Sequence, residues 1–125
     1  MADERALNAL PFTENWKVQK ASTFYKAYTL QLDGSAWNIT DATISLQVND
    51  NQKNTVLTAD ATITDAENGK FEFTLDSSKT NIAIGSHHYA VKLTIPAGDS
   101  NFPNGATFIL LKGNFVVESH AFKET

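Results

Sequence analysis

The residues in this sequence that could bind a metal ion are three histidines and several Asp-rich turns. His87 and His88 are adjacent, and adjacent side chains on a strand point to opposite faces, so the two cannot ligate one ion together. His120 lies in a different region. The turn at 49–51 resembles part of a calcium loop but lacks its regular ligand spacing and closing Glu. We therefore predict no metal site and interpret the histidine pair as polar residues at a strand start.

Catalytic groups are fewer still. The sequence contains no cysteine, which excludes a cysteine nucleophile, a thiolate metal site, a disulfide framework and a CxxC redox centre. No serine lies in a Gly-x-Ser-x-Gly motif, and no Gly-rich phosphate loop precedes a helical pattern. Carboxylates are plentiful, but nothing selects one pair as the acid and base of glycoside hydrolysis. We predict that the protein is not an enzyme, with no catalytic residue and no cofactor.

Aromatic side chains are the remaining candidates for ligand binding, because a ring offers a flat apolar face to a sugar. The aromatic residues that could serve are Trp16, Tyr25, Trp37 and Phe102. Trp37 fits better as a cover for one end of the core. A carbohydrate-binding adhesin module, with a host-surface glycan as partner, is kept as an alternative. The segment 38–40 matches the Asn-x-Thr acceptor motif of N-glycosylation, and we interpret this match as accidental, because no secretory signal precedes it.

The elements that position these residues are strands. Apolar and polar residues alternate with period two in four runs, at 24–32, 43–49, 70–76 and 88–95. This pattern is typical of strands with one buried and one solvated face, which favours antiparallel sheets. Gly, Asn and Asp turns separate the runs, as in a two-sheet sandwich. One helical turn is expected at 77–84, with Ser77 as its cap and Gly85 at its end, and Asp3 to Leu10 could form another.

Length and charge limit the possible partners. The chain has 125 residues, which suits one domain, and a net charge of -4, which argues against nucleic acid as the main partner. No apolar run approaches the roughly 18 residues of a spanning helix, so no membrane partner is expected. The start of the sequence lacks a secretory signal, so we expect the chain to be made in a cytoplasm.

The first residues are too apolar for a disordered tail. Their apolar side chains are Leu7, Leu10, Phe12, Trp16 and Val18. Two interpretations stay open. In one, Phe12 to Val18 forms an edge strand of the same sandwich; in the other, the segment is an arm that docks on a neighbouring subunit, with Leu7, Leu10, Phe12 and Trp16 as its anchors.

The run from Ala106 to Glu118 is apolar on both faces. Ile109, Leu111, Phe115 and Val117 make one face, whereas Phe108, Leu110 and Val116 put apolar groups on the other. A strand that is apolar on both faces is either covered on both sides or part of an interface. We predict an interface at Phe108, Leu110 and Val116, although the N-terminal segment could cover the same face internally.

Five motifs in this order resemble the N-terminal immunoglobulin-like domain of phage baseplate upper proteins. They are the segments 18–24, 39–46, 68–75, 80–93 and 112–117. The resemblance covers roughly Val18 to Glu118. It implies an antiparallel two-sheet immunoglobulin-like β-sandwich and a scaffold role in a phage particle.

Together these observations predict an N-terminal arm or edge segment at 1–17, a sandwich at 18–120 and a C-terminal tail at 121–125. The expected function is that of a non-enzymatic structural protein of a tailed bacteriophage, in the tail or baseplate. A capsid decoration (cement) protein is an alternative. The expected partners are other virion proteins in a homo-oligomer or symmetric assembly, and the expected location is the virion.

Overall fold

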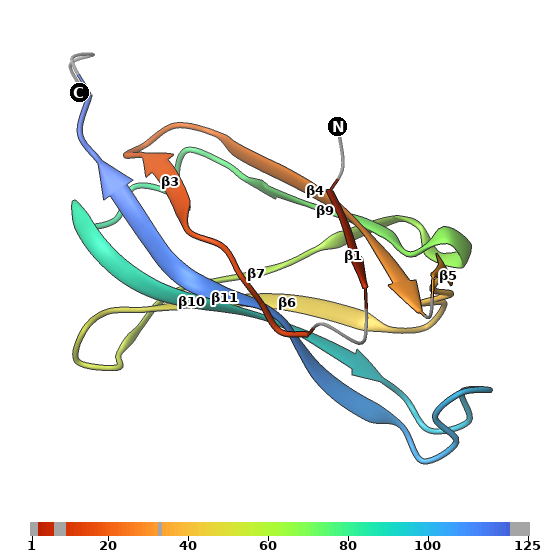
Figure 1. Cartoon of the computed structure of the whole chain (residues 1–125). Coiled ribbons are helices and arrows are strands. Elements are labelled where there is room, and N and C mark those ends of the chain that lie inside the picture. Colours follow the sequence, from red (N-terminus) through yellow and green to blue (C-terminus); the bar gives the residue numbers. More distant parts are fainter. Residues whose placement is uncertain (1–2, 7–9, 33, 121–125) are drawn as a thin grey trace.

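Two β-sheets pack face to face in the computed structural model, which describes residues 3–6, 10–32 and 34–120 (Figure 1). The first sheet, sheet A, contains β1 (Asp3–Ala6), β4 (Phe24–Leu32), β5 (Ser35–Ala36), β8 (Thr62–Asp65) and β9 (Lys70–Leu75). The second, sheet B, contains β2 (Phe12–Thr13), β3 (Trp16–Gln19), β6 (Thr43–Asn49), β7 (Thr55–Asp60), β10 (Gly85–Ile95) and β11 (Ala106–Glu118). The predicted all-β, two-sheet sandwich is confirmed.

The core lies between the sheets and follows the period-two pattern. In β6, β9 and β10 every second side chain is buried, and the residues between them face solvent wholly or in part. The buried apolar members of these strands are Ile44, Leu46, Val48, Phe71, Phe73, Leu75, Tyr89, Val91, Leu93 and Ile95. Burying apolar surface at about 25 cal/mol per Å² is the main stabilising term of such a core.

The N-terminal strands depart from the prediction in two ways. β1 pairs with β4, and β2 and β3 pair with β11, and all three pairings are parallel. The expectation of purely antiparallel sheets is therefore wrong at this segment. The helix considered for Asp3 to Leu10 is also wrong, because Asp3–Ala6 is a strand whose backbone is paired by β4. A helix of that length has too few internal hydrogen bonds to form without packing. The boundary drawn between residues 17 and 18 falls inside β3.

The helical turn expected at 77–84 is not a helix. Residues 77–79 form a turn that Asp76 caps, because its carboxylate oxygen Oδ1 accepts the Lys79 N–H at 3.0 Å. The cap is thus one residue before Ser77, and Gly85 begins β10. In the part of the chain that the structure describes, the one short helix is the 3-10 turn η2 (Ala66–Asn68).

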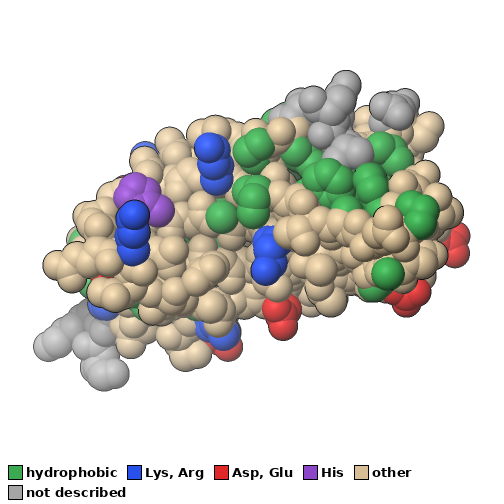
Figure 2. Space-filling view, turned by 90° about the horizontal axis from the view of Figure 1, so that it is seen from below, with side chains coloured by type: hydrophobic (Ala, Val, Ile, Leu, Met, Phe, Trp, Pro, Cys, Tyr) green, Lys and Arg blue, Asp and Glu red, His purple; other side chains and the backbone are tan. Residues whose placement is uncertain are grey.

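The edges of the two sheets meet on one side of the sandwich. β7 is the last strand of sheet B, and β8, which starts two residues after β7 ends, is the last strand of sheet A. The outer face of sheet B is a broad, open surface formed by β6, β7, β10 and β11 (Figure 2).

Among the described residues no helix is long and apolar enough to cross a membrane.

Candidate functional site

The N-terminal segment is built into the core of its own sandwich through Trp16. Its side chain is 1% exposed, and its ring stacks on Tyr89 with 4.2 Å between the ring centroids. Phe24 and Phe73 pack on it at 5.3 and 6.1 Å. An indole buried in this way contributes a large apolar area to the core, and aromatic contacts add to it. Trp16 therefore has no surface to present to a neighbour.

Glu14, in the link between β2 and β3, fixes this segment through polar contacts. Its Oε1 accepts hydrogen bonds from the Tyr28 hydroxyl and from Trp16 Nε1, the latter at 3.1 Å. Lys26 Nζ lies 3.6 Å from Oε2. Burial, and then the hydrogen bond to Glu14, raise the pKa of the Tyr28 hydroxyl above its ordinary value. The phenol therefore stays protonated as a donor to Glu14.

The backbone of Glu14 is held just as closely. Its N–H donates to the Lys112 carbonyl at 3.0 Å, and its own carbonyl accepts the Tyr89 hydroxyl at 2.7 Å. Gly113 makes this approach possible, because a Cβ at that position would lie 2.2 Å from the Glu14 carbonyl oxygen. The Asn114 N–H donates to Asn15 Oδ1 at 3.0 Å. We call these contacts between Glu14–Asn15 and β4, β10 and β11 the Glu14 junction.

The seven residues predicted to form an interface differ in how far the structure buries them. Trp16 and Leu110 are each 1% exposed, so neither offers a surface to a partner, and their assignment to an interface is corrected by the structure. Leu10, Phe12 and Phe108 are half-buried and packed against the core, and Val116 is half-buried. Leu7 lies outside the described residues. Two interpretations were open for the N-terminal segment, an edge strand of the same sandwich or an arm that docks on a neighbour. The structure shows the edge strand, because β2 and β3 pair with β11.

The faces predicted for β11 are wrong at its start, because the register against β10 shifts between Val91 and Lys92, which places Phe108 opposite the buried Leu93 and Ile109 opposite the exposed Lys92. Phe108 packs edge-on against Trp37 at 5.6 Å and against Phe102 at 5.3 Å. Trp37 is buried, as expected for a residue that covers one end of the core. Ile109, by contrast, is 41% exposed on the outer face of sheet B.

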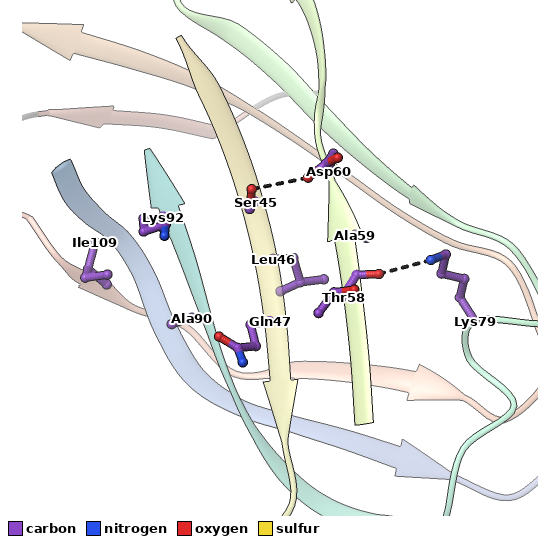
Figure 3. A pocket seen from close by; sticks show the side chains of 10 residues that line it. All are labelled: Ser45, Leu46, Gln47, Thr58, Ala59, Asp60, Lys79, Ala90, Lys92 and Ile109. Carbon is purple, nitrogen blue, oxygen red and sulfur yellow. Dashed lines mark hydrogen bonds between the residues drawn. The ribbon is translucent and has the colours of Figure 1, made fainter. Parts of the chain in front are cut away.

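The outer face of sheet B carries two adjoining hollows, which we call the sheet B face. The first, of about 550 Å³, is drawn in Figure 3 and is lined by Ser45, Leu46, Gln47, Thr58, Ala59, Asp60, Lys79, Ala90, Lys92 and Ile109. The second, of about 430 Å³, is lined by Thr13, Gln47, Asn49, His88, Tyr89, Ala90, Lys112, Gly113 and Asn114. The two share Gln47 and Ala90, so they form one continuous surface across neighbouring strands.

Hydrogen bonds hold the polar side chains at the β7 side of this face. Ser45 Oγ donates to Asp60 Oδ1 at 3.2 Å, and Lys79 Nζ donates to the Thr58 carbonyl at 3.0 Å (Figure 3). Gln47 Nε2 donates to Thr55 Oγ1 at 2.7 Å. The surface is thus a fixed array of donors and acceptors around a small central residue, Ala90. It suits contact with another macromolecular surface, since its groups are spread over several strands.

The other candidate groups from the sequence are dispersed. His87 is buried with Nε2 2.8 Å from the Ala83 carbonyl oxygen, whereas His88 lies on the solvent side of β10, so the two face opposite ways as predicted. Among the described residues no three His, Cys, Asp or Glu side chains are grouped so as to hold a metal ion. Of the proposed sugar platforms, Trp16 and Trp37 are buried and Tyr25 is 56% exposed.

Sequence reasoning did not single out the sheet B face. The alternation at 43–49 and 88–95 showed that Ser45, Gln47 and Lys92 face solvent, but it did not show which solvated faces adjoin. Pairing of β6 with β10 brings Ser45 opposite Lys92, and Gln47 opposite Ala90. Lys79 reaches the face from the turn at 77–79, which belongs to none of the strands of sheet B. The available signal was the small residue Ala90 flanked by polar positions.

Comparison with known proteins gives a likeness in fold alone. No protein-family model matches the chain, and no curated protein sequence matches it. Among solved structures, the chain is similar to one described as the N-terminal domain of phage TP901-1 ORF48. The TM-score is 0.59 and the identity 13%, and the match covers 94% of this chain and 99% of that one.

Proposed function

We propose that this chain is a non-enzymatic structural protein of a tailed bacteriophage particle, acting in the tail or baseplate through protein–protein contacts. The observation that carries the proposal is the likeness in fold to a domain of a phage protein, which spans nearly the whole of both chains. The order of the five sequence motifs supports the same proposal. The proposed location is the virion, and the proposed partners are other virion proteins.

The geometry suits a contact function. Because its N-terminal strands are joined to the core through the Glu14 junction, the sandwich is a preformed body that can bind without ordering a loose arm. A standard interface takes about 800 Å² from each partner, roughly a ninth of the 7232 Å² that this chain exposes. The sheet B face is the surface we propose for that contact, and such binding requires no active site.

Two other functions remain as outcomes of the test. A capsid decoration protein would use the same fold and kind of contact at the head. A carbohydrate-binding module would need exposed aromatic platforms, and burial of Trp16 and Trp37 removes two of the four proposed ones. We therefore favour a tail or baseplate component.

The test is the composition of purified tailed particles from the host that carries this gene. Quantitative mass spectrometry of gradient-purified tails and heads, separated after disruption, should find this chain in the tail fraction in a fixed ratio to the other tail proteins. Enrichment in the head fraction would instead support the decoration protein. Absence from the particles, together with glycan binding that a Tyr25→Ala variant loses, would overturn the proposal in favour of the adhesin module.

A further inference from the structure

Positive charge is concentrated on the sheet B face, although the chain as a whole is acidic. Three lysines and one acidic residue line this face: Lys79, Lys92, Lys112 and Asp60. The other described charged side chains are five lysines, Lys17, Lys20, Lys26, Lys53 and Lys70, and nine acids, Glu14, Asp41, Asp50, Asp65, Glu67, Glu72, Asp76, Asp99 and Glu118. The protein therefore has a basic face on an acidic body.

The lysines at the centre of the face are available to a partner. Lys92 and Lys112 are exposed, and within the described part of the chain neither has an ion-pair partner. Asp60 lies at the β7 margin, where Ser45 Oγ donates to it. Figure 2 shows separate lysine side chains standing over this face, with the acidic side chains at its lower and right margins.

Negative charge gathers at one end of the sandwich, where three loops meet. The loop at 38–41 is joined to η2 by the Ile39 N–H, which donates to the Ala66 carbonyl at 2.8 Å. Residues 38, 40, 41 and 96–101 line a common hollow of about 240 Å³ that includes Asp41 and Asp99. Asp65 is the residue before η2, and Glu67 lies within it. These loops, on the right in Figure 1, contain no lysine or arginine, and we call them the acidic end.

We propose that the sheet B face of one copy of this chain binds the acidic end of a second copy. The two surfaces are complementary in charge, and Ala90 and Ile109 add apolar contact between the lysines. A symmetric pairing of two sheet B faces is excluded as the main contact, because it would bring lysines of both copies together. This inference deepens the proposed function, on which it rests, by naming the occupant of the same surface.

The symmetry of the assembly follows from the use of two different surfaces. A contact between unlike surfaces is heterologous, so a bound pair keeps one free basic face on one copy and one free acidic end on the other, and addition continues until a ring closes or a filament grows. Exposed charge pairs contribute only about 0.2–1 kcal/mol each, and salt screens them. The contact is therefore weak between two free copies and strengthened where neighbours hold the chain in place.

The experiment measures self-association of the full chain by sedimentation velocity. We expect concentration-dependent association at about 0.01 M salt, where the Debye length is about 30 Å, and its loss at about 1 M, where it is about 3 Å. The variant Lys92→Glu with Lys112→Glu should weaken association at least about tenfold, since reversing two charges removes roughly 1.4 kcal/mol or more. The matched control, Lys20→Glu with Lys53→Glu, makes the same change in net charge away from both surfaces and should associate like the unmodified chain. Circular dichroism checks that each variant is folded, and Lys92→Gln with Lys112→Gln replaces the first variant if it is not.

A mixing experiment tests the two-surface contact directly. The face variant and an end variant, Asp41→Asn with Glu67→Lys, should each be monomeric alone, yet a mixture should form a dimer because each retains one intact surface. A monomeric unmodified chain at low salt, equal weakening by the control pair, or association only with added nucleic acid would overturn the inference. These results do not affect the particle composition that tests the proposed function, so the two can fail separately.

Discussion

Replacing Gly113 with alanine tests the Glu14 junction more directly than any other single substitution. A Cβ at this position would lie 2.2 Å from the Glu14 carbonyl oxygen and 2.9 Å from its carbon, and both are backbone atoms. An ordinary contact needs about 3.4 Å or more, so the β2–β3 link must move by about 1 Å. That shift breaks the hydrogen bonds of Glu14 with Tyr89 and with Lys112, each worth about 1 kcal/mol.

The matched control is Gly85→Ala in the same sheet. Gly85 and Gly113 both have positive φ, +132° and +159°, but nothing lies within 4 Å of a Cβ built on Gly85. Both variants therefore carry the cost of an unfavourable backbone conformation, and only Gly113→Ala carries the collision. We expect Gly113→Ala to be less stable than Gly85→Ala by about 2 kcal/mol, which for a chain of this length lowers Tm by about 8 °C.

Urea unfolding followed by tryptophan fluorescence is the assay, since Trp16 is buried beside the junction. The reasoning is refuted if Gly113→Ala and Gly85→Ala unfold at the same urea concentration with equal slopes. That result would mean that the N-terminal segment does not lie against β11 as described.

Three further predictions concern the same fold. The Tyr28→Phe variant should lose less stability above pH 10 than the unmodified protein, which thermal melts across alkaline pH check. The pKa of Tyr28 is raised in the folded state, so its protonated hydroxyl stabilises the fold fully below pH 10, and this stabilisation is lost as Tyr28 ionises in the unfolded chain. The Asp76→Asn variant should lose less stability in acid than the unmodified protein, because hydrogen bonds from Ser78 and Lys79 hold the pKa of Asp76 below 3.8, and the stability that the carboxylate contributes disappears as pH falls through and below that value. Thermal melts between about pH 7 and pH 2 would contradict this if the variant and the unmodified protein lost stability in parallel. Trp16→Ala should destabilise the chain by about 3–5 kcal/mol, and deletion of residues 1–17 should prevent folding, whereas a folded deletion variant by circular dichroism would show that the segment is an independent arm.

The strands and the core could be predicted because their signal is local. Alternation of Ile44, Leu46 and Val48 with polar residues fixes which side of β6 is buried, whatever its neighbours. The two-sheet sandwich followed from several such runs. The cap of the turn at 77–79 could not be found in this way, because Asp and Ser are both good caps, and in the structure Asp76 rather than Ser77 accepts the Lys79 N–H.

The N-terminal segment and the contact surface could not be predicted for a different reason. Trp16 is apolar whether it packs in its own chain or on a neighbour, so composition leaves both open. What decides is the pairing with β11, which lies about 100 residues away, and the lack of a Cβ at Gly113. The charge of the sheet B face likewise depends on which strands adjoin, since Lys79, Lys92 and Lys112 come from separate segments.

The central claim is that this chain is a tail or baseplate component held by protein–protein contacts. Cryo-electron microscopy of the intact particle tests it most directly, by locating density for the sandwich and identifying what lies against β6, β10 and β11. The account predicts repeated copies in the tail or baseplate, with the sheet B face covered by a neighbouring protein. Particles that lack the chain, or copies in which that face is open to solvent, would contradict it.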